Sequence, residues 1–253
     1  MSALLEARDV TKVFAGITAL DAVSLDVDTN EIVGLIGPNG AGKTTFFNCL
    51  LGLSRPEGGS VIFDGRDLAR IPTYKRARLG IARTFQRIEL FVGMTPREHF
   101  LVAERARNRN GSLVKDLMFR SRPTANENEL AEQMIELLGL RDVADRHVES
   151  LSLGLGRLVE IGRALMTQPK VVLLDEPSSG LDRSETEELA ATLRKVQQDT
   201  AVAILLVEHD VEMVRNLVSR VYVLDFGTLI ASGATAEVFA DDAVRRAYLG
   251  DLV

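Results

Sequence analysis

Gly37-Pro38-Asn39-Gly40-Ala41-Gly42-Lys43-Thr44 is the stretch that decides the fold, because it fits the pattern G-x-x-x-x-G-K-S/T at every defined position. An apolar run of strand length, residues 31–36, precedes it, and a helix-compatible run, residues 45–51, follows it. In such a context the glycines let backbone N–H groups turn towards phosphate oxygens, and the helix start adds its positive dipole. We therefore expect these eight residues and Thr45 to bind a nucleoside triphosphate.

Two side chains of this loop have separate expected roles. Lys43 should reach the β- and γ-phosphates, and the Thr44 hydroxyl should bind Mg²⁺. The alternative is a glycine-rich turn without a ligand. The correct placement of both residues, with a strand before and a helix after, argues against that alternative.

A second candidate site ends the apolar run at residues 171–174, which is followed by Asp175 and Glu176. A short continuous run of this kind is typical of a strand buried on both faces of a parallel sheet. Ligands bind beyond the carboxyl ends of such strands, so Asp175 is expected to hold Mg²⁺. Glu176 is the candidate to orient or deprotonate an attacking water. Solvated acids at a strand end are the alternative.

Four more short motifs follow in a definite order. Thr84-Phe85-Gln86 comes after the phosphate loop, and Leu151-Ser152-Leu153-Gly154-Leu155 comes before the carboxylate strand. Ser179-Gly180-Leu181-Asp182 follows Glu176, and His209 follows the apolar run 201–207. With the two sites above, this order resembles that of the ATP-binding cassette (ABC) family, and the resemblance covers nearly the whole chain.

The resemblance implies roles for further residues. ATP and Mg²⁺ are the implied ligands, with Gln86 sensing the γ-phosphate and the metal, and His209 holding the γ-phosphate and the attacking water. Ser152 and the backbone N–H groups near Gly154 would contact ATP bound to a second ABC ATPase subunit. Phe14 matches the place where the family stacks an aromatic ring on adenine, although a simple core position is the alternative.

The partners implied are a second cassette, in a homodimer or a paired heterodimer, and transmembrane permease subunits. The signature departs from the family pattern Leu-Ser-Gly-Gly-Gln, because Leu153 and Leu155 replace the first Gly and the Gln. A degenerate signature that works only beside an intact partner cassette therefore stays open. Apolar residues after Gln86 are expected to line a groove for a permease helix: Ile88, Leu90, Phe91 and Met94.

A narrower resemblance concerns the string 80–86, the pairs Leu90-Phe91 and Met94-Thr95, segment 104–128 and the ending Tyr248-Leu249-Gly250. These resemble the LivG-type ATP-binding subunit of branched-chain amino-acid importers. The expected function is therefore an ATPase that powers import of branched-chain or other hydrophobic amino acids. The alternatives are the ATPase of a lipid or lipopolysaccharide exporter, and a soluble ABC ATPase that does not transport.

The element pattern predicts an α/β fold with a P-loop NTPase core, in which a mostly parallel sheet has helices on both faces. Residues 4–10 and 20–27 alternate like antiparallel strands. We expect a single domain over 1–253, with its core at 1–88 and 167–253 and a helical subdomain inserted at 89–166. The other expected strands are 60–64, 171–174, 202–207 and 221–224, and the other expected helices are 127–140, one capped by Ser152, 184–197 and 211–218.

Composition bounds the location and the partners. The net charge of −6 argues against a nucleic-acid partner. Apolar runs of about seven residues are too short to span a bilayer, and the first residues do not resemble a signal peptide. The expected location is therefore cytoplasmic, and the resemblance to importer subunits implies a peripheral position on the inner face of the cell membrane. Segment 105–122 is basic, and we favour a solvated helix over a contact with anionic head groups.

Several isolated features are expected to be structural. The lone cysteine, Cys49, is interpreted as a buried small hydrophobe. His99 and His147 lack metal-ligand spacing. Residues 225–227 read Asp-Phe-Gly between two apolar runs, which predicts a hairpin turn.

Overall fold

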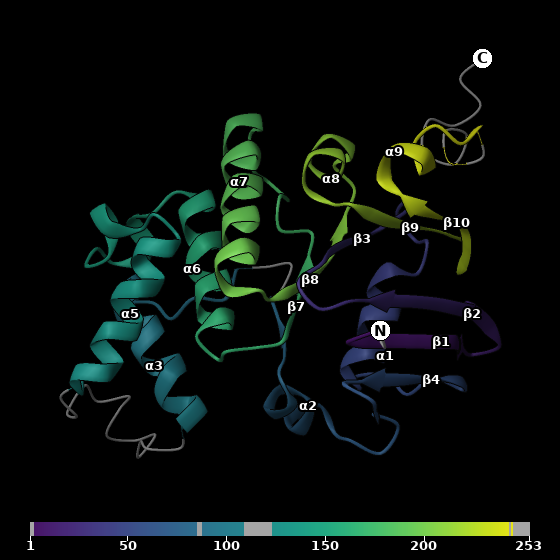
Figure 1. Cartoon of the computed structure of the whole chain (residues 1–253), viewed down its shortest axis with the longest axis horizontal. Helices are drawn as coiled ribbons and strands as arrows, with labels where there is room; N and C mark the ends of the chain where they lie inside the picture. Colours follow the sequence, from purple (N-terminus) through teal and green to yellow (C-terminus); the bar gives the residue numbers. More distant parts are fainter. Residues whose placement is uncertain (1–2, 85–87, 109–122, 243, 245–253) are drawn as a thin grey trace.

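The computed structural model describes residues 3–84, 88–108, 123–242 and 244. Its strands and helices form two sheets flanked by helices (Figure 1). The strands are β1 (Leu5–Phe14), β2 (Ile17–Val27), β3 (Ile32–Ile36), β4 (Gly58–Phe63), β5 (Arg66–Asp67), β6 (Ile81–Arg83), β7 (Val171–Asp175), β8 (Ala203–Glu208), β9 (Arg220–Asp225) and β10 (Thr228–Ala234). The α-helices are α1 (Lys43–Leu51), α2 (Thr73–Leu79), α3 (Pro96–Asn108), α5 (Ala125–Leu137), α6 (Leu153–Leu165), α7 (Arg183–Thr200), α8 (Val211–Leu217) and α9 (Thr235–Val238).

The central sheet has the strand order β10-β9-β3-β8-β7-β6. All neighbours from β9 to β6 pair in parallel, and β10 adds an antiparallel edge through the expected turn at Phe226 and Gly227. β3, β7 and β8 are buried at every residue, as their continuous apolar runs predict. The carboxyl ends of these three strands therefore meet at one edge of the sheet.

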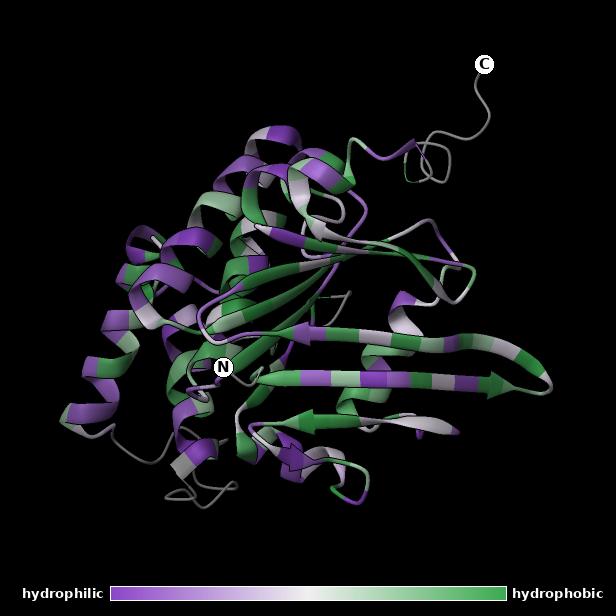
Figure 2. Cartoon of the chain, turned by 45° about the vertical axis from the view of Figure 1, so that its right-hand side comes forward, coloured by the Kyte–Doolittle hydropathy of each residue, from purple (hydrophilic) through white to green (hydrophobic). Residues whose placement is uncertain are grey.

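The second sheet has the order β2-β1-β4-β5 and is antiparallel. Its first two strands form a hairpin that is longer than the alternation at 4–10 and 20–27 indicated, with a turn at Ala15 and Gly16. Figure 2 shows β1 with hydrophilic and hydrophobic residues in alternation, whereas the central strands are hydrophobic throughout. This difference follows from exposure, because one face of the antiparallel sheet contacts solvent.

Two hydrophobic clusters pack on the two faces of the central sheet. One joins Ile36, Leu174 and Leu206 to α7, α8 and the helices between β6 and β7. The other joins Leu35, Leu173 and Val207 to α1 and the antiparallel sheet, and it includes the buried Cys49. Helices thus cover both faces, as predicted, but on the second face α1 shares the cover with β1, β2 and β4.

The described chain between β6 and β7 is helical. α3, α5 and α6 occur there with two 3₁₀ turns, Arg141–Val143 and Val148–Ser150. α5 begins with a reciprocal capping box in which Thr124 and Glu127 bond each other's backbone N–H, two residues before the start that the periodicity indicated. α6 begins at the predicted cap, because the Ser152 hydroxyl accepts a bond from Leu155 N.

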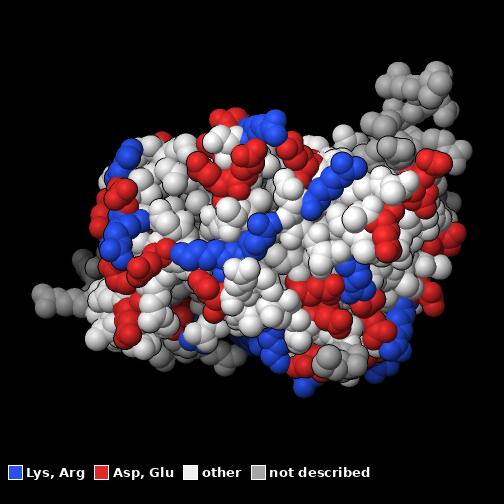
Figure 3. Space-filling view, turned by 45° about the horizontal axis from the view of Figure 1, so that its top comes forward, with Lys and Arg blue, Asp and Glu red and all other residues white. Residues whose placement is uncertain are grey.

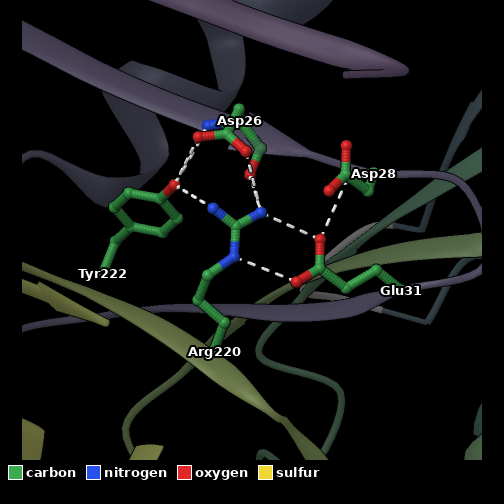
Figure 4. Close-up of polar contacts among 5 residues, drawn as sticks. All are labelled: Asp26, Asp28, Glu31, Arg220 and Tyr222. Carbon is green, nitrogen blue, oxygen red and sulfur yellow. Dashed lines mark hydrogen bonds and ion pairs between the residues drawn. The ribbon is translucent and has the colours of Figure 1, made fainter. Parts of the chain in front are cut away.

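An ion-pair network joins the two sheets at the end of β3 opposite the phosphate loop (Figure 4). The Arg220 guanidinium donates to both carboxylate oxygens of Glu31 at 2.9 Å, and it lies 2.8 Å from an oxygen of Asp26. It also donates to the Tyr222 hydroxyl, which in turn donates to Asp26 at 2.8 Å. β2, β9 and the start of β3 are therefore held together by one cation.

The structure adds elements that the sequence patterns did not predict. α2 and the three-residue β6 come before the glutamine motif, and β6 extends the central sheet beside β7. His99 is structural, as expected: Nδ1 lies 2.9 Å from Thr95 O, and Nε2 accepts a bond from Phe91 N at 2.9 Å. Within the described residues, no helix is both long enough and apolar enough to cross a bilayer.

Candidate nucleotide-binding site

The phosphate loop connects β3 to α1, and two of its glycines are required by its shape. Gly37 has φ 156°, and a Cβ there would lie 2.1 Å from the carbonyl oxygen of Leu224. Gly42 has φ 107°, and a Cβ there would lie 2.9 Å from Ala19 O. The loop is thus held against β9 and β2, where only glycine fits.

The start of α1 fits an anion. Its N-cap is Gly42, no side chain caps it, and its first turn has no acidic residue. The first backbone N–H groups of a helix have no partner inside the helix, so these groups can bind phosphate oxygens. Thr44 is exposed and Thr45 is half-buried in this first turn. The residues present therefore fit a nucleotide phosphate.

Lys43 lies over the loop. Its Nζ donates to Gly37 O at 2.7 Å and to Pro38 O at 3.0 Å, and the residue is buried. Burial lowers the pKa of Lys43, and nearby acids oppose this effect. Those acids are Glu176, Asp175 and Glu208. The strands bring the lysine and the two predicted carboxylates to one site.

Asp175 ends β7 and is buried, and it has a cationic neighbour that the sequence reasoning missed. Arg83 Nη2 donates to Asp175 Oδ2 at 2.9 Å, and Arg83 Nη1 donates to Asn48 Oδ1 at 3.2 Å. Burial raises the pKa of Asp175, and Arg83 opposes that rise. Arg83 ends β6, a strand of three residues that shows no periodicity, so no local sequence pattern indicates this contact.

Glu176 has an uncommon backbone conformation for a residue other than glycine, with φ 47°. Its N–H donates to Val207 O at 2.9 Å, which fixes it beside β8. Left-handed backbone at such a residue costs energy and tends to occur at functional sites. The side chain is half-buried at the edge where Lys43 lies.

His209 follows β8, and its side chain is 54% exposed. Sequence reasoning assigned a role to His209 and none to its neighbour Glu208. The structure places the Glu208 carboxylate inside the site, where its oxygens accept bonds from Ser178 N at 2.8 Å and His209 N at 3.0 Å. His209 Nδ1 lies 3.9 Å from Glu208 Oε2.

The sequence of the chain matches those of known proteins over most of its length. Residues 20–179 match the family model described as ABC transporter. The chain belongs to the ABC transporter family. As a member of that family, this cassette binds ATP and couples ATP hydrolysis to transport. Residues 228–252 match a second model, described as branched-chain amino acid ATP-binding cassette transporter.

Three relatives match this chain in sequence over nearly its whole length. The cassette is 39% identical over 251 residues to the high-affinity branched-chain amino acid transport ATP-binding protein BraF of Pseudomonas aeruginosa, covering 98% of each chain. It is 41% identical over 241 residues to LivG of Salmonella typhimurium, a protein of the same description, covering 94% of each chain. It is 34% identical over 248 residues to the lipopolysaccharide export system ATP-binding protein LptB of Haemophilus influenzae, covering 98% of each chain.

Solved structures agree with the fold. The ADP conformation of MJ1267, an ATP-binding cassette of an ABC transporter, superposes with a TM-score of 0.84 at 30% identity. The alignment covers 99% of this cassette and 100% of that chain. The P-loop NTPase core and the antiparallel sheet predicted from the sequence are therefore confirmed.

The altered signature of the cassette begins α6. Ser152 is exposed, and Leu153 is 44% exposed. A Cβ on Gly180 would lie 2.9 Å from Leu153 Cδ2, so this leucine lies against the Ser179–Asp182 motif of its own chain. The substituted side chain thus joins two motifs that were separate in the sequence analysis.

Phe14 and Gln86 are two further residues that the sequence predicts to contact the nucleotide. Phe14 is half exposed, with Lys12 Nζ 4.9 Å from its ring centroid, so its ring is accessible and its adenine role stays a prediction. Gln86 lies outside the described residues, as do most of the basic segment 105–122 and the ending 248–250.

A groove of about 1350 Å³ lies between α2, β6, α3 and α6. Leu90 and Phe91 line this α2–α6 groove, as predicted. Met94 does not line it and is buried, and Ile88 packs towards Gly156 of α6 instead. The charged lining residues are mostly basic: Arg76, Arg78, Arg83, Arg107, Arg163 and Lys170, against Glu89 and Glu160.

Proposed function

We propose that this cassette is the ATP-hydrolysing subunit of a membrane importer for branched-chain amino acids. The observation that carries the substrate class is the match of residues 228–252 to the branched-chain amino acid cassette model. The similarity to BraF and LivG over nearly their full length supports it.

We propose that the site works through the following groups of this chain. Lys43 and the backbone N–H groups of the loop and α1 bind and orient the phosphates. Glu176 orients or deprotonates the attacking water, and His209 holds that water and the γ-phosphate. Mg²⁺ would be held by Asp175, Thr44 and Gln86, and would neutralise charge on the phosphates. Phe14 would stack on adenine.

Ser152 and the backbone near Gly154 act on ATP bound to a second cassette. They lie at the exposed start of α6, where the helix dipole also favours an anion. The partner is a second copy or a paired cassette with an intact signature. We also propose the domain division inferred above, with the core at 1–88 and 167–253 and a helical subdomain at 89–166.

We propose that the α2–α6 groove receives a helix of a permease, on the inner face of the membrane. Its apolar lining suits an amphipathic helix. The face shown in Figure 3 carries acidic and basic residues side by side. The net charge of −6 leaves nucleic acid outside the proposed partners.

The docking proposal is tested by Phe91→Asp, which places a charge in the groove. This variant should stay folded and hydrolyse ATP alone as the wild type does, but it should lose association with the permease in membranes. Phe226→Asp is the matched control, because Phe226 is 88% exposed on the β9–β10 turn outside the groove. Equal membrane association of both variants would disprove docking at Phe91.

The substrate proposal is tested by uptake. Vesicles that contain the permease and the cassette should take up leucine, isoleucine or valine only with ATP and a functional Lys43. Similarity to LptB favours a second candidate, the ATPase of a lipopolysaccharide exporter. Extraction of lipopolysaccharide from the same vesicles, without amino-acid uptake, would support this second candidate instead.

A further inference from the structure

A buried carboxylate lies behind the candidate catalytic residues, at the carboxyl end of β8. Glu208 is fully buried. Its Oε1 accepts a bond from Ser178 N at 2.8 Å, and its Oε2 accepts bonds from His209 N at 3.0 Å and Asp210 N at 3.3 Å. One side chain therefore holds the loop after β7 and the loop after β8.

These are the two loops that carry Glu176 and His209. Glu176 lies two residues before Ser178, and its own N–H bonds to Val207, the residue before Glu208. His209 directly follows Glu208. Because the two oxygens of one carboxylate each fix one loop, the Glu208 side chain sets the separation between the backbones of Glu176 and His209.

The conformation of Glu176 adds a reason for this anchor. Its φ of 47° is unfavourable for a residue with a Cβ, so the turn would relax unless its neighbours opposed that change. The bond from Ser178 N to Glu208 holds the turn on its far side, and the bond from Glu176 N to Val207 O holds it on the near side.

We propose that Glu208 is a positioning residue for ATP hydrolysis, which fixes the separation between the loop that carries Glu176 and the loop that carries His209. This inference rests on the proposed roles of those two residues. A carboxylate accepts hydrogen bonds on both of its oxygens. A glutamine offers one acceptor oxygen and an NH₂ group, and the NH₂ group would face a backbone N–H. Glu208→Gln therefore releases one loop while it keeps the volume.

The test uses the full chain with whatever partner subunits its ATPase activity requires. Glu208→Gln and Glu208→Asp should lower kcat about tenfold to a hundredfold, as small displacements of reacting groups do, and should leave the Kd for ATP unchanged. Combined with His209→Ala, Glu208→Gln should lower kcat less than it does alone, because the catalytic His209 side chain that Glu208 positions is then already absent.

Glu104→Gln is the matched control, because Glu104 is equally buried but lies on α3, paired with Arg107. It should cost stability and leave kcat unchanged. The proposal is overturned if the Glu208 variants keep the wild-type kcat, or if their kcat losses multiply with that of His209→Ala. It is also overturned if ATP binding weakens in parallel with kcat, or if both Glu208 variants fail to fold. Unchanged kcat in Glu176→Gln and His209→Ala alone would instead refute the proposed catalytic roles.

Discussion

The Nε2 atom of His99 accepts a hydrogen bond from Phe91 N at 2.9 Å, and the two rings stack with centroids 5.7 Å apart. Because Nε2 accepts, Nδ1 carries the proton and donates to Thr95 O. The neutral imidazole thus fixes the backbone of the residue that we propose to contact the permease. A doubly protonated ring would lose the acceptor.

Acid should therefore loosen this loop. Burial lowers the pKa of His99 below its ordinary value of about 6.5. The folded state stays neutral where the unfolded state binds a proton, so the free energy of unfolding should fall as the pH drops below about 6.5. Urea unfolding against pH measures this effect. His99→Gln, which keeps an acceptor for Phe91 N, should lose that pH dependence and bind the permease better than His99→Asn does.

Lys43→Ala should weaken ATP binding by an order of magnitude or more, because charge-assisted hydrogen bonds contribute about 1.5–3 kcal/mol. Isothermal titration with ATP measures the loss. Lys195→Ala, at an exposed position on α7, is the control and should bind normally. An unchanged Kd in Lys43→Ala would contradict the proposed phosphate contact.

Glu176→Gln keeps the shape of the side chain and removes its basicity. The rate of ATP hydrolysis should fall by roughly 10²–10⁴-fold, while ATP binding persists. With ATP present, the variant should elute as a dimer on size-exclusion chromatography. Glu187→Gln, an exposed change on α7, should hydrolyse ATP normally. Hydrolysis at the wild-type rate in Glu176→Gln would remove this residue from the proposed mechanism.

Ser152→Ala should lower dimer-dependent hydrolysis by about 10²–10³, because the hydroxyl would no longer meet the γ-phosphate of the partner. The change also removes a helix cap, which costs about 1 kcal/mol. Thr124→Ala removes the cap of α5 and is the control for that cost. Leu155→Gln should change hydrolysis little.

The dependence of ATPase activity on protein concentration tests whether the partner cassette is a second copy of this chain or a different one. Specific activity that rises steeply for the cassette alone indicates a homodimer. Negligible activity that appears only with a second cassette indicates the paired heterodimer.

Alkali should weaken the junction of the two sheets. Burial raises the pKa of Tyr222 to about 12, so the folded state keeps a phenol proton that the unfolded state loses near pH 10. Stability should therefore be full below about pH 10 and fall by about 2–3 kcal/mol as the pH rises to about 12. In urea unfolding of Tyr222→Phe, the free energy of unfolding should no longer fall over this pH range. An equal slope in the variant would show that another group titrates.

The sequence predicted the parts of the site that follow from local patterns. The phosphate loop and Asp175 come directly after apolar runs, and these runs became strands buried on both faces. Arg83 and Glu208 were not predicted as site residues, because their partners lie 92 and 30 residues away. Those pairings depend on strand order, which no local pattern contains. β6 was missed because three residues show no periodicity.

The strand order also governs when the phosphate loop can form during synthesis. β3 precedes the loop in the chain, but it pairs with β8 and β9, strands that begin at Ala203 and Arg220. The carbonyl that packs against Gly37 belongs to Leu224. A ribosome therefore releases the whole motif long before it releases the strands that shape it. Nascent chains of intermediate length therefore carry the apolar β3 without its pairing strands, and such unpaired apolar strands favour aggregation.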